Sequence, residues 1–416
     1  MRLERALLGL LVMIGLAILC STDRRSIRLR TVAAALACQI AIGALVLYVP
    51  GGVRALAALA HGVDWLLGYG QRGGDFLFGG LVDGKMSELF GDKGFVFALR
   101  VLPNIIFVST LIAVLYHIGV MQRFARLIGW LFEKLLAVSP VESFSAVTTI
   151  FLGQNDLPIA IRPYLRHMSR TELMCAMSSG VASIAASMLA GYAGLGVRMD
   201  YLIAASFMAI PGGLLYAKLL MPTPPGEASR DLPAPDEEEK RAVNVIEAAA
   251  IGATNGARIA FAIAIMLIGF IGLIALFNGV VGGLFGLIGH PDITLETLLG
   301  GFFAPLAYLL GVPWGSSGLV GELIGQKLVF NEFVAYVSLS PYLRDAGAVL
   351  LDERSKAIAS FALCGFANFT SIAVLLGCFG GAIPERRGEI AQLGLRAVLA
   401  GTLSNLTSAC IAGLFL

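Results

Sequence analysis

The sequence has few charged residues for its length, and this shortage excludes most soluble folds. Only 14% of the 416 residues are Asp, Glu, Lys or Arg, whereas 57% are hydrophobic and the mean hydropathy is +0.82. A water-soluble fold of this size cannot bury that much apolar surface. The apolar residues form runs of about 20, each long enough to cross roughly 30 Å of hydrocarbon. We therefore expect an all-α integral membrane protein.

Signatures of metal sites, redox sites and nucleic-acid binding are scarce as well. The four histidines are far apart in the sequence and offer no zinc motif. The six cysteines lie in apolar stretches without paired spacing, so we interpret them as small buried hydrophobic residues. The net charge is only +2 and no basic block occurs. The sequence thus predicts no cofactor and no nucleic-acid partner.

Eight apolar segments are predicted to span the membrane. The first is expected to be a retained span and not a signal peptide, because Leu19 stands where cleavage needs a small residue and Arg24 and Arg25 follow. If the basic loops stay in the cytoplasm, both termini face outward. The predicted spans are residues 6–20, 31–48, 102–121, 173–194, 201–221, 257–279, 357–380 and 393–416.

Three other regions do not fit a simple span. Residues 51–94 and 284–312 are apolar but are interrupted by Gly, Pro and charge, which predicts interfacial or shallow helices. Residues 222–255 carry several prolines and a run of charges. This composition favours a flexible cytoplasmic connector between two membrane halves.

Two shorter segments predict re-entrant hairpins. Residues 143–152 make about 15 Å of helix, or half a membrane, before Gly-Gln-Asn-Asp at 153–156 interrupts them. Asn or Asp can cap a new helix, and Pro158 suits its first turn. Residues 322–343 break in a similar way at the Asn-Glu pair 331–332. An ordinary capped turn between interfacial helices is the alternative for the first segment.

The two hairpins belong to an internal repeat. Each tip is followed by the same letters, Pro-Tyr-Leu-Arg, at 163–166 and at 341–344, then by a helix of small residues and one final span. An odd number of crossings separates the hairpins, so we expect the repeats to be inverted. Inverted repeats with broken helices place polar tips near the midplane, where many secondary transporters bind substrate. A carboxylate at that depth is costly unless it serves a ligand or a pathway.

Three motifs around the second hairpin are similar to those of the concentrative nucleoside transporters. They are Glu-Leu-Ile-Gly-Gln-Lys at 322–327, Asn-Glu-Phe-Val-Ala-Tyr at 331–336 and Cys-Gly-Phe-Ala-Asn at 364–368, and the resemblance covers essentially the whole chain. It implies a secondary active transporter, not an enzyme, that takes up ribonucleosides with a cation across a bacterial inner membrane. It also implies a homotrimer whose protomers each carry a scaffold domain and a transport domain that moves like an elevator.

The resemblance divides the chain into five parts. We expect a mainly scaffold part, the first transport repeat, a cytoplasmic connector, a scaffold span with an interfacial helix, and the second transport repeat. In this order they are residues 1–140, 141–221, 222–255, 256–318 and 319–416.

The resemblance further implies a ribose site at the second hairpin and the helix after it. The matching residues here are Glu332, Phe366, Asn368 and Ser371. A carboxylate and an amide suit vicinal hydroxyls, and the spacing predicts that Asn368 and Ser371 share a helix face. Hydrogen bonding between helices is the alternative role for those two residues.

The nucleobase side is implied to lie at the first hairpin tip. Family members typically have Gln-Thr-Glu where this chain has Gln154, Asn155 and Asp156, so its base preference is left open. Met188 stands where the family has a smaller apolar residue beside the base. A flexible core filler is the equal alternative for Met188.

A sodium site is implied by the same resemblance. Its residues here are Thr149, Leu152, Ser183 and Ile184. Sodium-coupled members have an Asn at the position of Thr149, but a hydroxyl still offers an oxygen to a hard cation. The alternative is proton coupling through a carboxylate at one of the tips. We expect sodium.

Two rival functions stay open from the residues alone. An intramembrane hydrolase would use Asp156 and Glu332 as a paired acid and base. A channel would line its pore with the polar tips. Accumulation of unchanged solute against its gradient separates a transporter from both.

Overall fold

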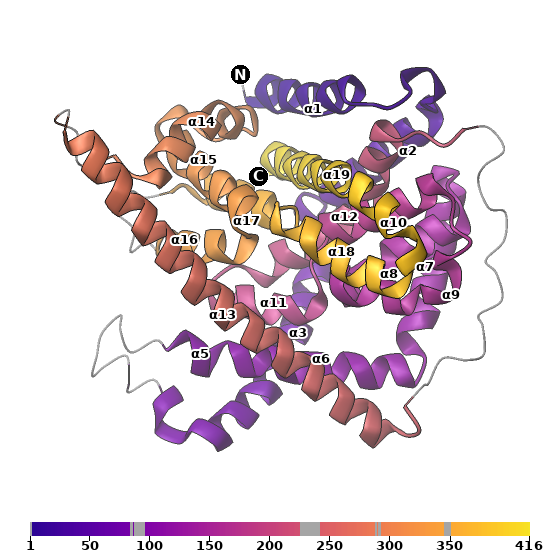
Figure 1. Cartoon of the computed structure of the whole chain (residues 1–416), viewed down its shortest axis with the longest axis horizontal. Coiled ribbons are helices and arrows are strands. Elements are labelled where there is room, and N and C mark those ends of the chain that lie inside the picture. Colours follow the sequence, from indigo (N-terminus) through magenta and orange to yellow (C-terminus); the bar gives the residue numbers. More distant parts are fainter. Residues whose placement is uncertain are drawn as a thin grey trace.

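The structure is a computed structural model that describes most of the chain. The described residues are 2–83, 86, 96–224, 242–287, 289, 293–344 and 351–416. Within these ranges every regular element is a helix and no strand occurs (Figure 1). This confirms the all-α class that the long apolar runs predict. Parts of three predicted segments, 51–94, 222–255 and 284–312, lie outside the described residues.

Several helices are long and apolar enough to cross a membrane. In the described part of the chain there are six, or seven if one bent pair counts as a span. A protein with many spans is thus supported, while the count of eight stays a prediction because α1 (Arg2–Leu19) is not among the six. The six are α2 (Leu29–Leu47), α5 with α6 (Phe97–Arg100 and Leu102–His117), α10 with α11 (Arg170–Ala182 and Ala186–Gly194), α12 (Met199–Leu220), α13 (Val245–Gly286), and η4 with α19 (Pro384–Arg386 and Arg387–Phe415).

Helix α13 is longer than the predicted span 257–279. It has 42 residues and crosses the face of the molecule as a long diagonal rod (Figure 1). It begins where the side chain of Asn244 accepts a hydrogen bond from the backbone N–H of Glu247 at 2.9 Å. This cap starts the helix inside the segment that composition alone predicts as a flexible connector.

The predicted span 357–380 is wrong as a single helix. Two helices replace it, α17 (Glu353–Leu363) and α18 (Thr370–Ala382). Packing at the interruption is tight, because a Cβ at Gly365 would lie 2.2 Å from Asn405 Oδ1 and 2.6 Å from the carbonyl oxygen of Ala182. Only a glycine permits that approach.

The first predicted hairpin corresponds to α8 (Pro140–Ala160) and the short α9 (Arg162–Leu165). A capping box of Ser139 and Glu142 starts α8. At Gly153 the backbone has φ 64° and ψ −169°, so the helix is interrupted at the start of the predicted break. The interruption is observed, and the re-entrant path stays a prediction.

The second predicted hairpin corresponds to α15 (Trp314–Val329) and α16 (Glu332–Leu343). Asn331 caps α16 by accepting a hydrogen bond from Val334 N at 2.8 Å. The first limb begins at Trp314, earlier than the predicted residue 322. It packs on α14 (Leu295–Leu309) across a bend of 114°.

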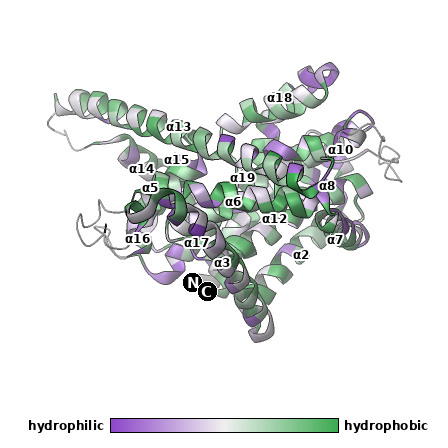
Figure 2. Ribbon diagram, turned by 90° about the horizontal axis from the view of Figure 1, so that it is seen from below, coloured by the Kyte–Doolittle hydropathy of each residue, from purple (hydrophilic) through white to green (hydrophobic). Residues whose placement is uncertain are grey.

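The helices form two packing groups. In the first group, α12 lies at the centre against α2, α10 and α19, and α1 packs on α19. In the second, α13 packs mainly along α6. Apolar residues dominate α12, which is almost entirely buried (Figure 2). The remaining elements are η1 (Arg24–Ser26), α3 (Pro50–Phe78), η2 (Gly79–Val82) and α7 (Val120–Leu136).

Candidate functional site

A chain of buried hydrogen bonds links the two hairpins. Gln154 Nε2 donates to Ser371 Oγ at 3.1 Å, and Ser371 N donates to Asn368 Oδ1 at 2.9 Å. Asn368 Nδ2 donates to Glu332 Oε2 at 3.2 Å, and the hydroxyl of Tyr192 donates to Glu332 Oε1 at 2.9 Å. All five residues are buried, with at most 5% of each exposed. They form one connected polar cluster in an apolar core.

Each member of the cluster lies at or beside an interrupted helix. Gln154 follows the kink of α8, and Glu332 is the first residue of α16. Asn368 and Ser371 lie where α17 gives way to α18, and Tyr192 is in α11, the second half of another broken helix. Helix breaks free backbone groups that need polar partners, so four breaks that converge create a polar centre inside an apolar protein.

The predicted helix face shared by Asn368 and Ser371 is not formed. Asn368 precedes α18, which begins at Thr370. Its Oδ1 accepts hydrogen bonds from Ser371 N at 2.9 Å and from Thr370 Oγ1 at 2.6 Å. Asn368 therefore bonds the free donors at the start of α18 with its oxygen, while its nitrogen points to Glu332.

Phe366 and Met188 lie in the same region, but only Phe366 contacts the kink of α8. Its ring packs against the kink of α8, because a Cβ at Gly153 would lie 3.0 Å from Phe366 Cε2. Its backbone N–H donates to Ser183 O at 3.3 Å. Met188 is 6% exposed within the apolar core, so its role as a base contact stays a prediction.

Asn155 and Asp156 stand apart from the hydrogen-bonded cluster. Asn155 is exposed and Asp156 is partly exposed, and the side chain of neither forms a hydrogen bond within the described residues. Glu332 instead bonds Tyr192 and Asn368. The pairing of Asp156 with Glu332 that a hydrolase would require therefore has no support. The described residues also contain no group of three or more His, Cys, Asp or Glu that could hold a metal ion.

Two of the four residues of the expected cation site are in direct contact. Ser183 Oγ donates to the carbonyl oxygen of Thr149 at 3.3 Å, and Thr149 Oγ1 donates to Ala146 O at 2.7 Å. A hydroxyl that donates its proton keeps lone pairs for a cation. Neutral oxygens suit sodium, so this pair fits the ion. The contributions of Leu152 and of the buried Ile184 stay predictions.

Two residues of this region were not predicted from the sequence. Tyr192 holds Glu332, and Lys327 is 2% exposed in α15. Lys327 had a signal, because a charged residue within an apolar segment is costly unless it has a role. Tyr192 had none, since tyrosine is common in membrane helices.

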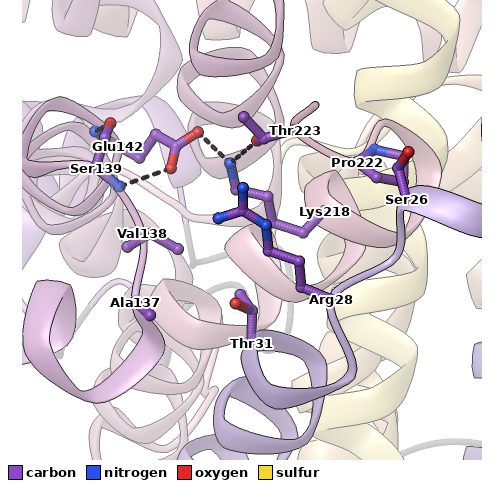
Figure 3. Close-up of a pocket in the computed structure, with 10 residues that line it drawn as sticks. All are labelled: Ser26, Arg28, Thr31, Ala137, Val138, Ser139, Glu142, Lys218, Pro222 and Thr223. Carbon is purple, nitrogen blue, oxygen red and sulfur yellow. Dashed lines mark hydrogen bonds and ion pairs between the residues drawn. The ribbon is translucent and has the colours of Figure 1, made fainter. Parts of the chain in front are cut away.

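A second polar cluster lies well away from the hairpin tips in the sequence. It lines a small pocket in which Lys218 Nζ bonds the carboxylate of Glu142 and Thr223 Oγ1 (Figure 3). This ion pair ties the start of α8 to the end of α12. Because each charge has its partner, we assign it a structural role.

Models of known families match most of the chain. One described as the C-terminus of Na⁺-dependent nucleoside transporters matches residues 201–413, and one described as their N-terminus matches 8–81. A third, described as a gate for nucleoside recognition, matches 98–199. The nucleoside permease NupC of Helicobacter pylori is 44% identical over 99% of this chain and 97% of its own length.

Solved structures agree with these matches. CNTnw in an inward-facing, substrate-bound state has a TM-score of 0.96 and 53% identity, covering 100% of this chain and 98% of that chain. A variant of CNTnw in an outward-facing state has a TM-score of 0.97 at the same identity, covering 100% and 99%. The fold and the order of the helices are therefore shared over the whole length.

Proposed function

The chain belongs to the family of concentrative nucleoside transporters, and on this premise we propose that it takes up ribonucleosides in symport with sodium. The observation that carries the proposal is the buried cluster running from Gln154 to Glu332 between the two interrupted hairpins. A soluble core would not need this cluster. A membrane carrier needs polar groups at depth that can replace the water around its solute.

The cluster offers the groups that a nucleoside requires. Glu332 supplies carboxylate oxygens and Asn368 an amide, which suit the vicinal hydroxyls of ribose. Gln154 Oε1 and Asn331 Nδ2 are buried without a hydrogen-bond partner within the described residues. A bound polar ligand could supply the missing partner of each atom. We assign Gln154, Asn155, Asp156 and Met188 to the nucleobase side.

The sodium ion, which is cargo here and not a cofactor, is proposed to bind beside the kink of α8. Thr149, Leu152, Ser183 and Ile184 would supply oxygens there. Ser183 O already bonds the backbone N–H of Phe366. An ion that orders this break would also order Phe366 against the bound nucleoside. This is a direct route for coupling the two solutes.

An elevator motion is proposed for alternating access. The packing of α13 mainly along α6 favours these two helices as the scaffold. Both hairpins, with α10 to α12 and α17 to α19, would form the moving domain. Helix α1 packs on α19, and α2 packs on α12 and α19. This packing favours placing α1 and α2 in the moving domain. The resemblance, in contrast, assigns residues 1–140 mainly to the scaffold. A homotrimer in a bacterial inner membrane completes the proposal.

Uptake by proteoliposomes tests the proposal. Radiolabelled uridine and adenosine would be offered with a sodium gradient and a proton gradient imposed separately. We expect accumulation of unchanged nucleoside that follows the sodium gradient. Uptake that ignores sodium and collapses with a protonophore would transfer the coupling role to a carboxylate at a tip.

Glu332→Gln is the matching variant. It keeps the shape of the side chain but removes the charge that accepts from ribose hydroxyls, and we expect uptake to fall at least about tenfold, as for a lost charge-assisted hydrogen bond. Glu353→Gln is the control, since that carboxylate is 75% exposed in its side chain and lies outside the cluster. Normal uptake by a folded Glu332→Gln protein would remove Glu332 from the site.

A further inference from the structure

Lys327 is a buried lysine whose amino group has no acidic partner in direct contact. Only 2% of the residue is exposed. Its Nζ donates to Ala362 O at 2.8 Å and to Asn405 Oδ1 at 2.7 Å, and no carboxylate forms an ion pair with it in the described part of the chain. The other two buried lysines among the described residues, Lys218 and Lys356, form ion pairs with Glu142 and Glu353. An ammonium kept at this depth without an ion pair requires another explanation.

Lys327 bonds the end of one broken helix directly and is linked through Asn405 to the end of another broken helix in the other repeat. Ala362 is the penultimate residue of α17. Asn405 accepts from Lys327 with Oδ1 and donates with Nδ2 to the carbonyl oxygen of Ala182, the last residue of α10, at 2.7 Å. The C-terminus of a helix carries partial negative charge and unpaired carbonyls. The amino group of Lys327 and the amide of Asn405 therefore bond the carbonyls of two buried helix ends.

The place of Lys327 in its repeat matches that of the sodium residues in the other repeat. Thr149 lies four residues before the kink at Gly153, and it contacts Ser183, which directly follows α10. Lys327 lies two residues before the end of α15, and it contacts Ala362 near the end of α17. In both repeats, the end of the first hairpin limb meets the broken helix that follows. The contact lies at the end of the first half of that helix.

From this correspondence we propose that Lys327 is a resident cation. Its ammonium takes, in the second repeat, the place that the exchangeable sodium takes in the first. The inference rests on the proposed sodium symport. It assigns one exchangeable cation to each nucleoside, because the second cation position is filled by the chain itself.

The test is the sodium dependence of uridine binding to the purified full-length protein, measured by calorimetry with choline holding the ionic strength constant. We expect a Hill coefficient of about 1 for the unsubstituted chain. Lys327→Ala empties the position but keeps the carbonyl oxygens around it. Its sodium midpoint should rise at least about tenfold with a Hill coefficient approaching about 2, and ethylammonium should lower the midpoint again.

Two matched variants separate charge from shape. Lys327→Met fills the space without charge, so its affinity for uridine should fall about tenfold and recover with neither ion. Lys218→Met removes the buried ammonium that pairs with Glu142, and it should lower thermal stability while leaving the sodium dependence unchanged. If Lys327→Ala unfolds without ligand, its melting temperature should rise in sodium or ethylammonium but not in choline.

Three results would overturn the inference. They are an unchanged sodium curve for Lys327→Ala, a loss of affinity that neither cation reverses, and an unfolded protein that neither cation rescues. Failure of the proposed symport looks different, because the unsubstituted chain itself would then bind uridine without any sodium dependence.

Discussion

At the scale of single residues, the site is defined by side chains that meet across long stretches of sequence. Motifs at the two helix breaks predict Gln154, Glu332, Asn368 and Ser371, and these four share one hydrogen-bonded cluster. Tyr192 was missed because it lies 140 residues from the carboxylate that it holds. No local pattern can announce such a contact. It follows only from how the broken helices pack.

The identity of the driving ion can be tested by substituting Thr149. Its hydroxyl donates to Ala146 O, and its carbonyl accepts from Ser183. Thr149→Val keeps the volume and the β-branch but deletes one oxygen, so the sodium concentration for half-maximal uptake should rise about 5- to 30-fold, as for one lost ligand of about 1–2 kcal/mol. The measurement is uridine uptake against sodium at constant pH. Thr148→Val is the control, because its hydroxyl also bonds its own helix but is not a proposed ligand.

Asn155 and Asp156 should govern the choice of base. They lie at the first tip, and the side chain of neither is engaged in a hydrogen bond within the described residues, so both side chains are available to a base. Asn155→Thr combined with Asp156→Glu restores the pair typical of the family. We expect a changed ranking of purine and pyrimidine competitors in uptake assays, with the preference for ribosides over deoxyribosides retained. The assignment fails if the base ranking is unchanged or if only the sugar preference shifts.

At the scale of elements, the helix breaks marked by polar residues within an apolar segment can be predicted from the sequence, and the others cannot. Gly153 and Asn331 mark interruptions in the sequence itself. The segment 357–380 contains no proline and reads as a continuous apolar span. At its break, Asn405 and Ala182 occupy the space that a side chain at position 365 would need. Hydropathy does not register such tertiary contacts, so it does not find the break.

The kink of α8 makes Gly153 the most sensitive glycine of the site. Its φ is +64°, and a Cβ there would lie 2.8 Å from Ala185 Cβ. Gly153→Ala should therefore abolish high-affinity uridine binding and lower the melting temperature, since strain and crowding act together. Gly79→Ala is the matched control, with φ +55° but no atom within 4 Å of the added Cβ. Equal effects of the two variants would mean that backbone strain alone, and not contact with Phe366 and Ala185, explains the result.

At the scale of the whole molecule, the sequence predicts the membrane class and the repeat, but it does not delimit the bodies that move. The 42-residue length of α13 and the packing of α1 on α19 emerge only from the fold. Apolar segments look alike whether they face lipid, a scaffold or a moving domain. For this reason hydropathy alone cannot check the expected domain boundary at residue 140 or the expected count of eight spans.

The proposed motion predicts that a link between α13 and the second hairpin stops transport. Phe270 of α13 and Phe330 at the end of α15 have ring centroids 5.8 Å apart. In a background without native cysteines, Phe270→Cys with Phe330→Cys should cross-link on oxidation, block uridine uptake and recover with reductant, because the hairpin must slide along α13. Tyr48→Cys with Phe415→Cys is the matched pair. Those rings are 6.1 Å apart and both belong to the proposed moving body, so that link should leave uptake unchanged. Full uptake by the cross-linked first pair would show that the hairpin tip and α13 keep their contact throughout the cycle, which an elevator does not allow.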